Sequence, residues 1–285
     1  MRPHSAFRFA LALLVAGVSV LLVHGDTVED YLKQARRALQ NKEADKAVKL
    51  ADKAIAAAPK DDRGYLMRGV GYEMLRQHDK SIADFTRCIE RDPKRAVAYD
   101  HRGSEQFILG HIKKSLDDFD KFLKLQPKEA PGHWKRGIAL YYAGRYEAGR
   151  QQFKDGDKVF ANDVENAVWH FLCNAKVKGI EKARSEILKI GKDTRVPMMK
   201  AYDLFLGKCK PADVLTAAEA GEVPAEKRKL RRFYAHLYLG LYYDAVGDKR
   251  KALEHMNLAA GKYRLGYMGD VAHVHAELLR KEMKK

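Results

Sequence analysis

The stretch Asp62–Arg95, DRGYLMRGVGYEMLRQHDKSIADFTRCIERDPKR, decides the fold, because its pattern recurs at a fixed interval on either side. The clearest marker is a proline near the end of each interval, since Pro59, Pro93 and Pro127 lie 34 residues apart. Proline ends one helix without disturbing the next, so each interval holds a complete helical unit. The spacing predicts three consecutive units and a fourth that lacks the proline: 28–61, 62–95, 96–129 and 130–163.

Each interval repeats the same residue types at the same positions. Small residues at the eighth and twentieth positions let the two helices of a unit approach closely, while larger side chains fill the space beside them. The repeated residues are Tyr31, Tyr65 and Tyr99 (fourth position), Ala35, Gly69 and Gly103 (eighth), Ala47, Ser81 and Ser115 (twentieth), and Ala51, Phe85 and Phe119 (twenty-fourth). This pattern resembles the tetratricopeptide repeat (TPR), which implies an all-α superhelix of antiparallel helix pairs.

The period is lost after the fourth unit and returns once. Gly240 and Met256 then take the eighth and twenty-fourth positions, which predicts a late helix pair. A terminal helix with apolar and charged faces is expected to cap the stack. The sections expected after the fourth unit are an irregular helical segment (164–224) and a C-terminal section (225–285) that holds the late unit (about 233–266) and the capping helix.

The first 25 residues have the pattern of an export signal. Arg2 and Arg8 are followed by the apolar run Phe9–Val23, which is shorter than the roughly 20 residues that a membrane-spanning helix needs. Residues 1–25 are therefore expected to be a cleaved signal peptide, with an uncleaved N-terminal anchor as the alternative. We expect an exported, periplasmic or otherwise extracytoplasmic protein with no transmembrane span after signal removal.

The chain is strongly basic, with 54 Lys and Arg against 38 Asp and Glu and a net charge of +16. Such a balance favours anionic partners, although lysine-rich repeats also keep a long surface soluble. The densest basic cluster is a candidate dock for a membrane surface or an anionic cell-wall polymer. The export signal argues against nucleic acid. The cluster consists of Lys227, Arg228, Lys229, Arg231 and Arg232.

Two segments extend the resemblance beyond the generic repeat. RGIALYYAGR (136–145) and FYAHLYLGLYYDAVGD (233–248) are similar to the matching parts of NlpI-type bacterial TPR lipoproteins of the cell envelope. That resemblance implies an envelope adaptor or scaffold whose partners include peptidoglycan hydrolases and a protease. The chain departs from those lipoproteins at one point, because it lacks a cysteine after the signal and its first is Cys88.

The first helices of stacked units line a concave surface, and their inward positions are unusually apolar here. Such a groove suits a peptide or a partner helix. The alternatives are that the terminal helix of the chain fills the groove, or that a second copy does so in a homodimer. The predicted groove residues are Leu66, Met67, Val70, Met74, His101, Ser104, Phe107, Trp134, Lys135, Ile138, Tyr141 and Tyr142.

Nothing in the sequence indicates catalysis, a cofactor or a metal. Phosphate-binding glycine motifs, the G-x-S-x-G nucleophile motif and H-E-x-x-H are all missing. His273 and His275 diverge by roughly 200° on a helix and do not suit a shared ion. Whether Cys173 and Cys209 form a disulfide stays open from the sequence. The function expected is non-enzymatic protein binding, with a self-associating TPR oligomer as the alternative.

Overall fold

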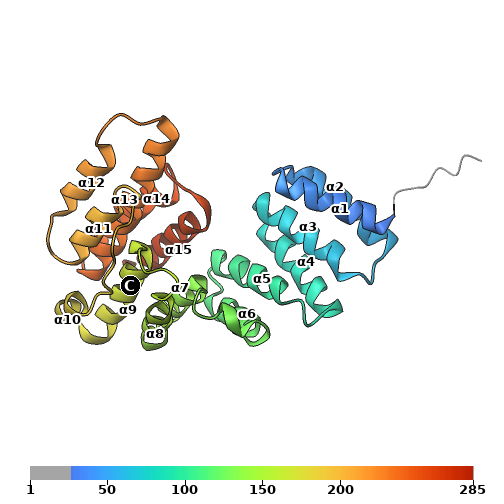
Figure 1. Cartoon of the computed structure of the whole chain (residues 1–285), viewed down its shortest axis with the longest axis horizontal. Helices are drawn as coiled ribbons and strands as arrows, with labels where there is room; N and C mark the ends of the chain where they lie inside the picture. The colour runs from blue at the N-terminus through green and yellow to red at the C-terminus, as the bar shows by residue number, and fades with distance from the viewer. Residues whose placement is uncertain (1–26, 285) are drawn as a thin grey trace, which may run out of the picture.

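The computed structural model describes residues 27–284, in which the regular elements are all helices and no β-strand is present (Figure 1). The predicted signal, residues 1–25, lies outside this part. Across residues 27–284 no helix is long and apolar enough to cross a bilayer. The elements are α1 Val28–Gln40, α2 Ala44–Ala57, α3 Asp62–Met74, α4 His78–Arg91, α5 Ala96–Ile108, α6 Ile112–Leu125, the 3-10 helix η1 Pro127–Glu129, α7 Trp134–Tyr142, α8 Tyr146–Gly156, α9 Val164–Lys178, α10 Ile180–Ser185, α11 Met198–Phe205, α12 Pro211–Glu219, α13 Ala225–Ala245, α14 Lys249–Ala260 and α15 Gly266–Glu282.

The helix pairs α1–α2, α3–α4, α5–α6 and α7–α8 are held together by the small-residue contact that the sequence predicts. A Cβ atom on Gly69 would lie 2.7 Å from the ring of Phe85, and one on Gly103 would lie 2.8 Å from the ring of Phe119. Both distances are too short for carbon atoms, so glycine is required wherever the partner is phenylalanine. In the first unit the twenty-fourth residue is Ala51 rather than phenylalanine, and the eighth residue is Ala35 rather than glycine. The predicted TPR-like all-α superhelix is confirmed.

The turn between the two helices of each unit places one residue in the left-handed region. Late units use glycine there, which adopts a positive φ without a steric penalty. The first two units instead hold Lys42 and Arg76 at φ of 61° and 57°. A side chain in this conformation costs roughly 1–2 kcal/mol. The equivalent glycines are Gly110, Gly144 and Gly247.

A second repeating contact joins neighbouring units. The donor is an arginine at the seventh position of a unit. It donates to two side chains: one lies on the second helix of the same unit, and the other lies on the second helix of the preceding unit. Arg102 illustrates the geometry, since its Nε and Nη2 lie 2.8 and 2.7 Å from the carboxylate oxygens of Asp118. The three sets are Arg68 with Asp84 and Asp52, Arg102 with Asp118 and Thr86, and Arg136 with Gln152 and Asp120.

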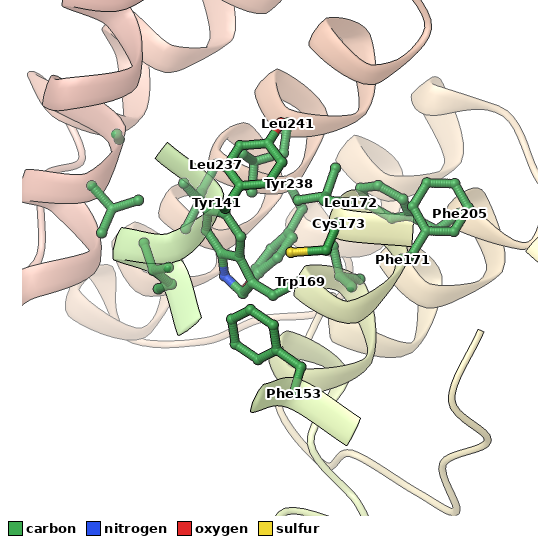
Figure 2. Close-up of a cluster of buried hydrophobic side chains, with 14 of the residues drawn as sticks. Tyr141, Phe153, Trp169, Phe171, Leu172, Cys173, Phe205, Leu237, Tyr238 and Leu241 are labelled. Atoms are coloured by element: carbon green, nitrogen blue, oxygen red, sulfur yellow. The ribbon is translucent and has the colours of Figure 1, made fainter. Parts of the chain in front are cut away.

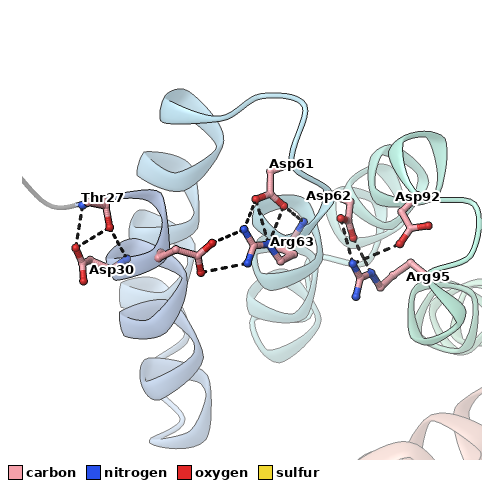
Figure 3. A network of polar contacts seen from close by, with 8 residues as sticks. Thr27, Asp30, Asp61, Asp62, Arg63, Asp92 and Arg95 are labelled. Atoms are coloured by element: carbon pink, nitrogen blue, oxygen red, sulfur yellow. Dashed lines mark hydrogen bonds and ion pairs between the residues drawn. The ribbon is translucent and has the colours of Figure 1, made fainter.

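Charged pairs also connect the N-terminal ends of the first helices (Figure 3). Thr27 caps α1 in a capping box with Asp30. The Arg63 guanidinium bridges Asp61, the cap of α3, and Glu29 on α1, with shortest contacts of 2.6 Å to each. These contacts fix the relative positions of α1 and α3, and with them the start of the concave surface.

The regular stacking of pairs ends at α9, around which the largest core forms. Trp169 of α9 is 1% exposed and packs against Phe153 of α8 and Tyr141 of α7 (Figure 2). Phe171, on another side of α9, meets Phe205 of α11 with ring centroids 5.1 Å apart. Helices α9 to α12 thus form a helical junction between the regular array and the last three helices.

The late pair is α13–α14, which repeats the packing of the early units. A Cβ atom on Gly240 would lie 2.9 Å from the Met256 side chain, as its place in the repeat predicts. The first helix of this pair is longer than expected and begins at Ala225. After α14 the chain turns back, and α15 lies on the side of α7 opposite α8 (Figure 1).

Candidate functional site

The candidate site is the concave surface formed by α1, α3, α5 and α7. Residues 34 positions apart occupy equivalent places on these helices, so their exposure can be compared directly. Along one such row, Arg36 is exposed, Val70 is partly exposed, Ser104 is 4% exposed and Ile138 is 1% exposed. The surface is therefore open at the first units and covered at the third and fourth.

Helix α15 is what covers the third and fourth units. The Tyr267 ring stacks on Phe107 with centroids 5.7 Å apart and meets the edge of Trp134 at 5.4 Å. Further along α15, the Tyr142 hydroxyl lies 2.9 Å from Nδ1 of His275. The terminal helix thus occupies the groove in the way that a partner helix would.

Charged groups hold the start of α15 against the second unit. Arg76 Nη2 donates to Asp270 Oδ1 at 2.8 Å, and Arg264 donates to the same oxygen. Asp270 is 4% exposed, so the carboxylate that accepts both contacts is shielded from bulk water. Arg76 is the residue that replaces glycine in the left-handed turn of its unit. Its side chain therefore has a tertiary role that a glycine could not supply.

A close contact between two largely buried titratable groups, His78 and Glu105, lies beside this contact. Glu105 is 1% exposed, and burial, followed by the charges of Glu73 and Asp270, raises its pKa to about 8. Burial also lowers the pKa of His78, whose Nδ1 lies 2.8 Å from Glu105 Oε2. Both shifts favour the neutral forms, so the contact between His78 and Glu105 is better described as a hydrogen bond between buried groups than as an ion pair.

At units three and four the structure shows one of the alternatives named for the groove, in which the terminal helix of the chain fills it. Four of the predicted groove residues are buried in the folded chain, because α15 and the inter-unit core cover them: Ser104, Phe107, Ile138 and Tyr141. Among the others, Met74 is 37% exposed. The remaining residues are partly exposed: Leu66, Met67, Val70, His101, Trp134, Lys135 and Tyr142.

The part that stays accessible combines apolar and basic side chains. Lys33 and Arg36 of α1 are exposed and occupy the same repeat positions as Met67 and Val70 of α3, with Met74 one turn further on. We call these five residues the open concave face. Its rim on α5 is polar, since His101 Nδ1 lies 2.7 Å from Glu73 Oε2. The arrangement suits an apolar segment that carries negative charge.

Most of the predicted basic patch is engaged in contacts within the chain. Arg228 and Arg231 donate to carbonyl oxygens at the C-terminal end of α12, including that of Ala220. Arg232 pairs with Glu219 at 2.6 Å. These arginines of α13 interact with the C-terminal end of α12, so less of their positive charge is available to an anionic surface. The two lysines of the patch are Lys227, which is exposed, and Lys229, which is partly exposed.

The histidine and cysteine candidates have structural surroundings. His275 is 4% exposed, and burial lowers its pKa to about 4, so it is neutral at pH 7 despite Asp244 Oδ2 at 3.7 Å. Cys173 and Cys209 are both free thiols. Within residues 27–284, no group of three or more His, Cys, Asp or Glu side chains is placed to hold a metal ion.

Sequence reasoning missed two features of this surface. The seventh-position arginines recur every 34 residues, so the repeat alignment contains a signal for them in Arg68, Arg102 and Arg136. The contact between Arg76 and Asp270 joins residues 194 apart and has no counterpart in the other units. Periodicity therefore points to the first feature and gives no indication of the second.

Comparisons with known proteins agree with this geometry. Residues 62–95 match a family model described as tetratricopeptide repeat. No curated protein shows significant sequence similarity to the chain. A tetratricopeptide repeat protein from Parabacteroides merdae superposes with a TM-score of 0.56 at 15% identity, covering 90% of this chain and 100% of that one.

Two further solved structures share the fold. The protein titled MamA has a TM-score of 0.52 at 17% identity, with coverage of 70% of this chain and 100% of that one. MamA from Desulfovibrio magneticus has a TM-score of 0.52 at 14% identity, with coverage of 56% and 91%. At these identities the similarity defines a TPR fold and does not extend to a shared function.

Proposed function

We propose that this chain is a non-enzymatic adaptor that binds a partner protein through the open concave face. The occupant is a peptide segment with apolar side chains and carboxylates. The observation that carries the proposal is the change of exposure along the groove, because the same surface is filled by α15 at unit four and left open at units one and two. The concave surface that binds α15 therefore extends past the end of α15 to units one and two.

Charge and polarity both support this occupant. Met67, Val70 and Met74 offer apolar contact, and methionine adapts to segments of different shape. Lys33 and Arg36 add two positive charges in the same repeat positions one unit earlier. Electrostatic attraction of this kind speeds association and selects acidic partners over basic ones.

The cellular setting forms part of the proposal. The N-terminal signal pattern and the resemblance to NlpI-type lipoproteins support an exported adaptor of the cell envelope, with hydrolases or proteases as partners. Lipid anchoring is not part of it, because the chain has no cysteine near residue 26. The TPR fold supports a binding role over catalysis, since its helices are engaged in repeat packing.

The test is direct binding of defined peptides to the mature protein, residues 26–285. Fluorescein-labelled peptides that alternate leucine and glutamate are compared by anisotropy with peptides of equal length that alternate leucine and lysine. We expect the acidic series to bind preferentially. Met67→Gln, which keeps the charge of the face unchanged, should then weaken binding roughly tenfold, because burying one methionine side chain is worth about 1.5 kcal/mol. Val177→Gln is the matched control, since Val177 is 46% exposed on α9.

Two results would count against the proposal. Equal binding of acidic and basic peptides would remove the argument from charge. A stable dimer in light scattering that dissociates in Met67→Gln, but not in Val177→Gln, would show that a second copy occupies the face. In that case the chain is a self-associating scaffold rather than an open adaptor.

A further inference from the structure

A cavity of about 220 Å³ lies where the regular array meets the helical junction and α15. Its walls come from α7, α8, the loop between α8 and α9, the start of α9 and the first turn of α15, and they are mainly apolar, with four aromatic side chains. Figure 2 shows two of these side chains, Phe153 and Trp169, whose rings stack with centroids 6.3 Å apart. The lining residues are Trp134, Ile138, Phe153, Phe160, Asp163, Glu165, Asn166, Trp169 and Met268.

Carboxylates are present in excess at this cavity. Asp163 and Glu165 line it, and together with Asp193 they share one guanidinium, that of Arg195. The three contacts to Arg195 measure 2.6, 2.5 and 2.5 Å. Three carboxylates facing one arginine leave a local deficit of positive charge, in a chain whose net charge is +16.

The polar groups at Glu165 are arranged to support a negative site. Glu165 accepts a hydrogen bond of 2.8 Å from the Tyr238 hydroxyl. Burial raises the pKa of Glu165, and Arg195 opposes that rise. A bound cation would add to the effect of Arg195 and favour the ionised carboxylate. The cavity is therefore better satisfied electrostatically when a positive group enters it.

From this geometry we infer that the cavity is a binding site for an organic cation, namely an ammonium group on a short apolar stem. Indole rings are the best aromatic partners for such a cation, and Trp134 and Trp169 both line the cavity. The volume is below the roughly 300 Å³ at which pockets for drug-sized ligands begin, so it suits one head group or one side chain. The inference does not rest on the open concave face.

Two sources supply this chemistry, a free quaternary ammonium compound and a lysine side chain of a partner protein. The two tryptophans of the chain both line the cavity, so tryptophan fluorescence of the mature protein responds to a ligand bound there. Choline represents the free compound, and its uncharged carbon isostere, 3,3-dimethylbutan-1-ol, is the control. N-acetyl-lysine-methylamide represents the side chain, with the norleucine analogue as its control.

We expect at least one of the two cations to change the fluorescence saturably at constant ionic strength, with its neutral analogue binding at least fivefold more weakly. The cation that binds identifies the source. Asp163→Asn should weaken binding about fivefold, as expected from the loss of roughly 1 kcal/mol of charge interaction. Asp163 is also the N-cap of α9, where its side chain accepts from the backbone N–H of Glu165. Asparagine caps helices equally well, so α9 should keep its N-terminal cap in this variant.

Asp157→Asn is the matched control, because it makes the same charge change six residues earlier and outside the cavity lining. Circular dichroism confirms that both variants fold. The inference is overturned if neither cation changes the fluorescence or if neutral analogues bind as tightly. Equal weakening by Asp157→Asn and Asp163→Asn also overturns it, since the effect would then come from overall charge.

Discussion

The packing of α15 in the groove should become less stable in acid because of His275. This imidazole is buried and lies 2.9 Å from the Tyr142 hydroxyl. Its folded pKa is about 4, against 6.5 for an unperturbed histidine, and burial is the main cause. The charged groups that also act on it are Asp244 of α13, Lys249 of α14, Lys176 of α9 and Glu282 of α15.

The sign follows from which state binds the proton first. Because the folded pKa lies below the unfolded one, the unfolded chain takes up the proton at higher pH, and the stability due to neutral His275 is lost as the pH falls from 6.5 towards 4. For a folded pKa of about 4, proton linkage removes about 2 kcal/mol between pH 7 and pH 5.

His275→Gln removes the titration and keeps an amide that can hydrogen-bond to Tyr142. Chemical unfolding followed by far-UV circular dichroism gives the free energy of unfolding at pH 7 and pH 5. Wild type should lose about 2 kcal/mol more than His275→Gln over this interval. His170 and His236, whose pKa values burial also lowers to about 4, are present in both proteins and cancel in the difference.

His273→Gln is the matched control, because His273 is partly exposed two residues earlier on the same helix. It should show the pH dependence of wild type. If His275→Gln lost as much stability as wild type on acidification, burial of a neutral imidazole would not explain the acid sensitivity. The proposed role of His275 in seating α15 would then be refuted.

Three further predictions concern packing and chemistry. Gly103→Ala should destabilise the fold by about 1–2 kcal/mol, because the overpacking caused by the new Cβ atom exceeds the gain in helix propensity. Gly132→Ala should not destabilise the fold, because a Cβ atom there meets no atom closer than 3.8 Å. Arg102→Met should lower the free energy of unfolding by about 3 kcal/mol, because it leaves Asp118 buried and unpaired. Arg87→Met, at an exposed ion pair, should lower it by less than about 0.5 kcal/mol. Urea unfolding measures the stability of all four variants. Two of the three cysteines are buried, so a thiol reagent should titrate at most one rapidly in the native protein and three after denaturation.

The repeat could be predicted from the sequence because its contacts are local. The eighth and twenty-fourth residues of a unit are 16 apart, and a pair such as Gly103 and Phe119 satisfies the same steric condition in each unit where it occurs. A condition repeated at constant spacing leaves a periodic record in the sequence. The late pair, marked by Gly240 and Met256, could be recognised for the same reason.

The candidate site was only partly predictable. The inward positions of the first helices follow from the repeat, so Met67, Val70 and Met74 could be identified as surface candidates. Their accessibility could not, because it depends on where α15 packs. Likewise, the basic cluster was visible in the sequence, but the use of Arg228 and Arg231 as caps for α12 depends on a packing that no local pattern records.

The sequence by itself therefore determined the helical pairs, their register and the face that they turn inwards. Only the tertiary structure decided how much of that face is open, since the contacts that cover it join residues 133 and 194 positions apart. Each of those contacts occurs once and involves different residue types, Tyr142 with His275 and Arg76 with Asp270. Without repetition or fixed spacing, complementarity between distant surfaces appears only after the chain has folded.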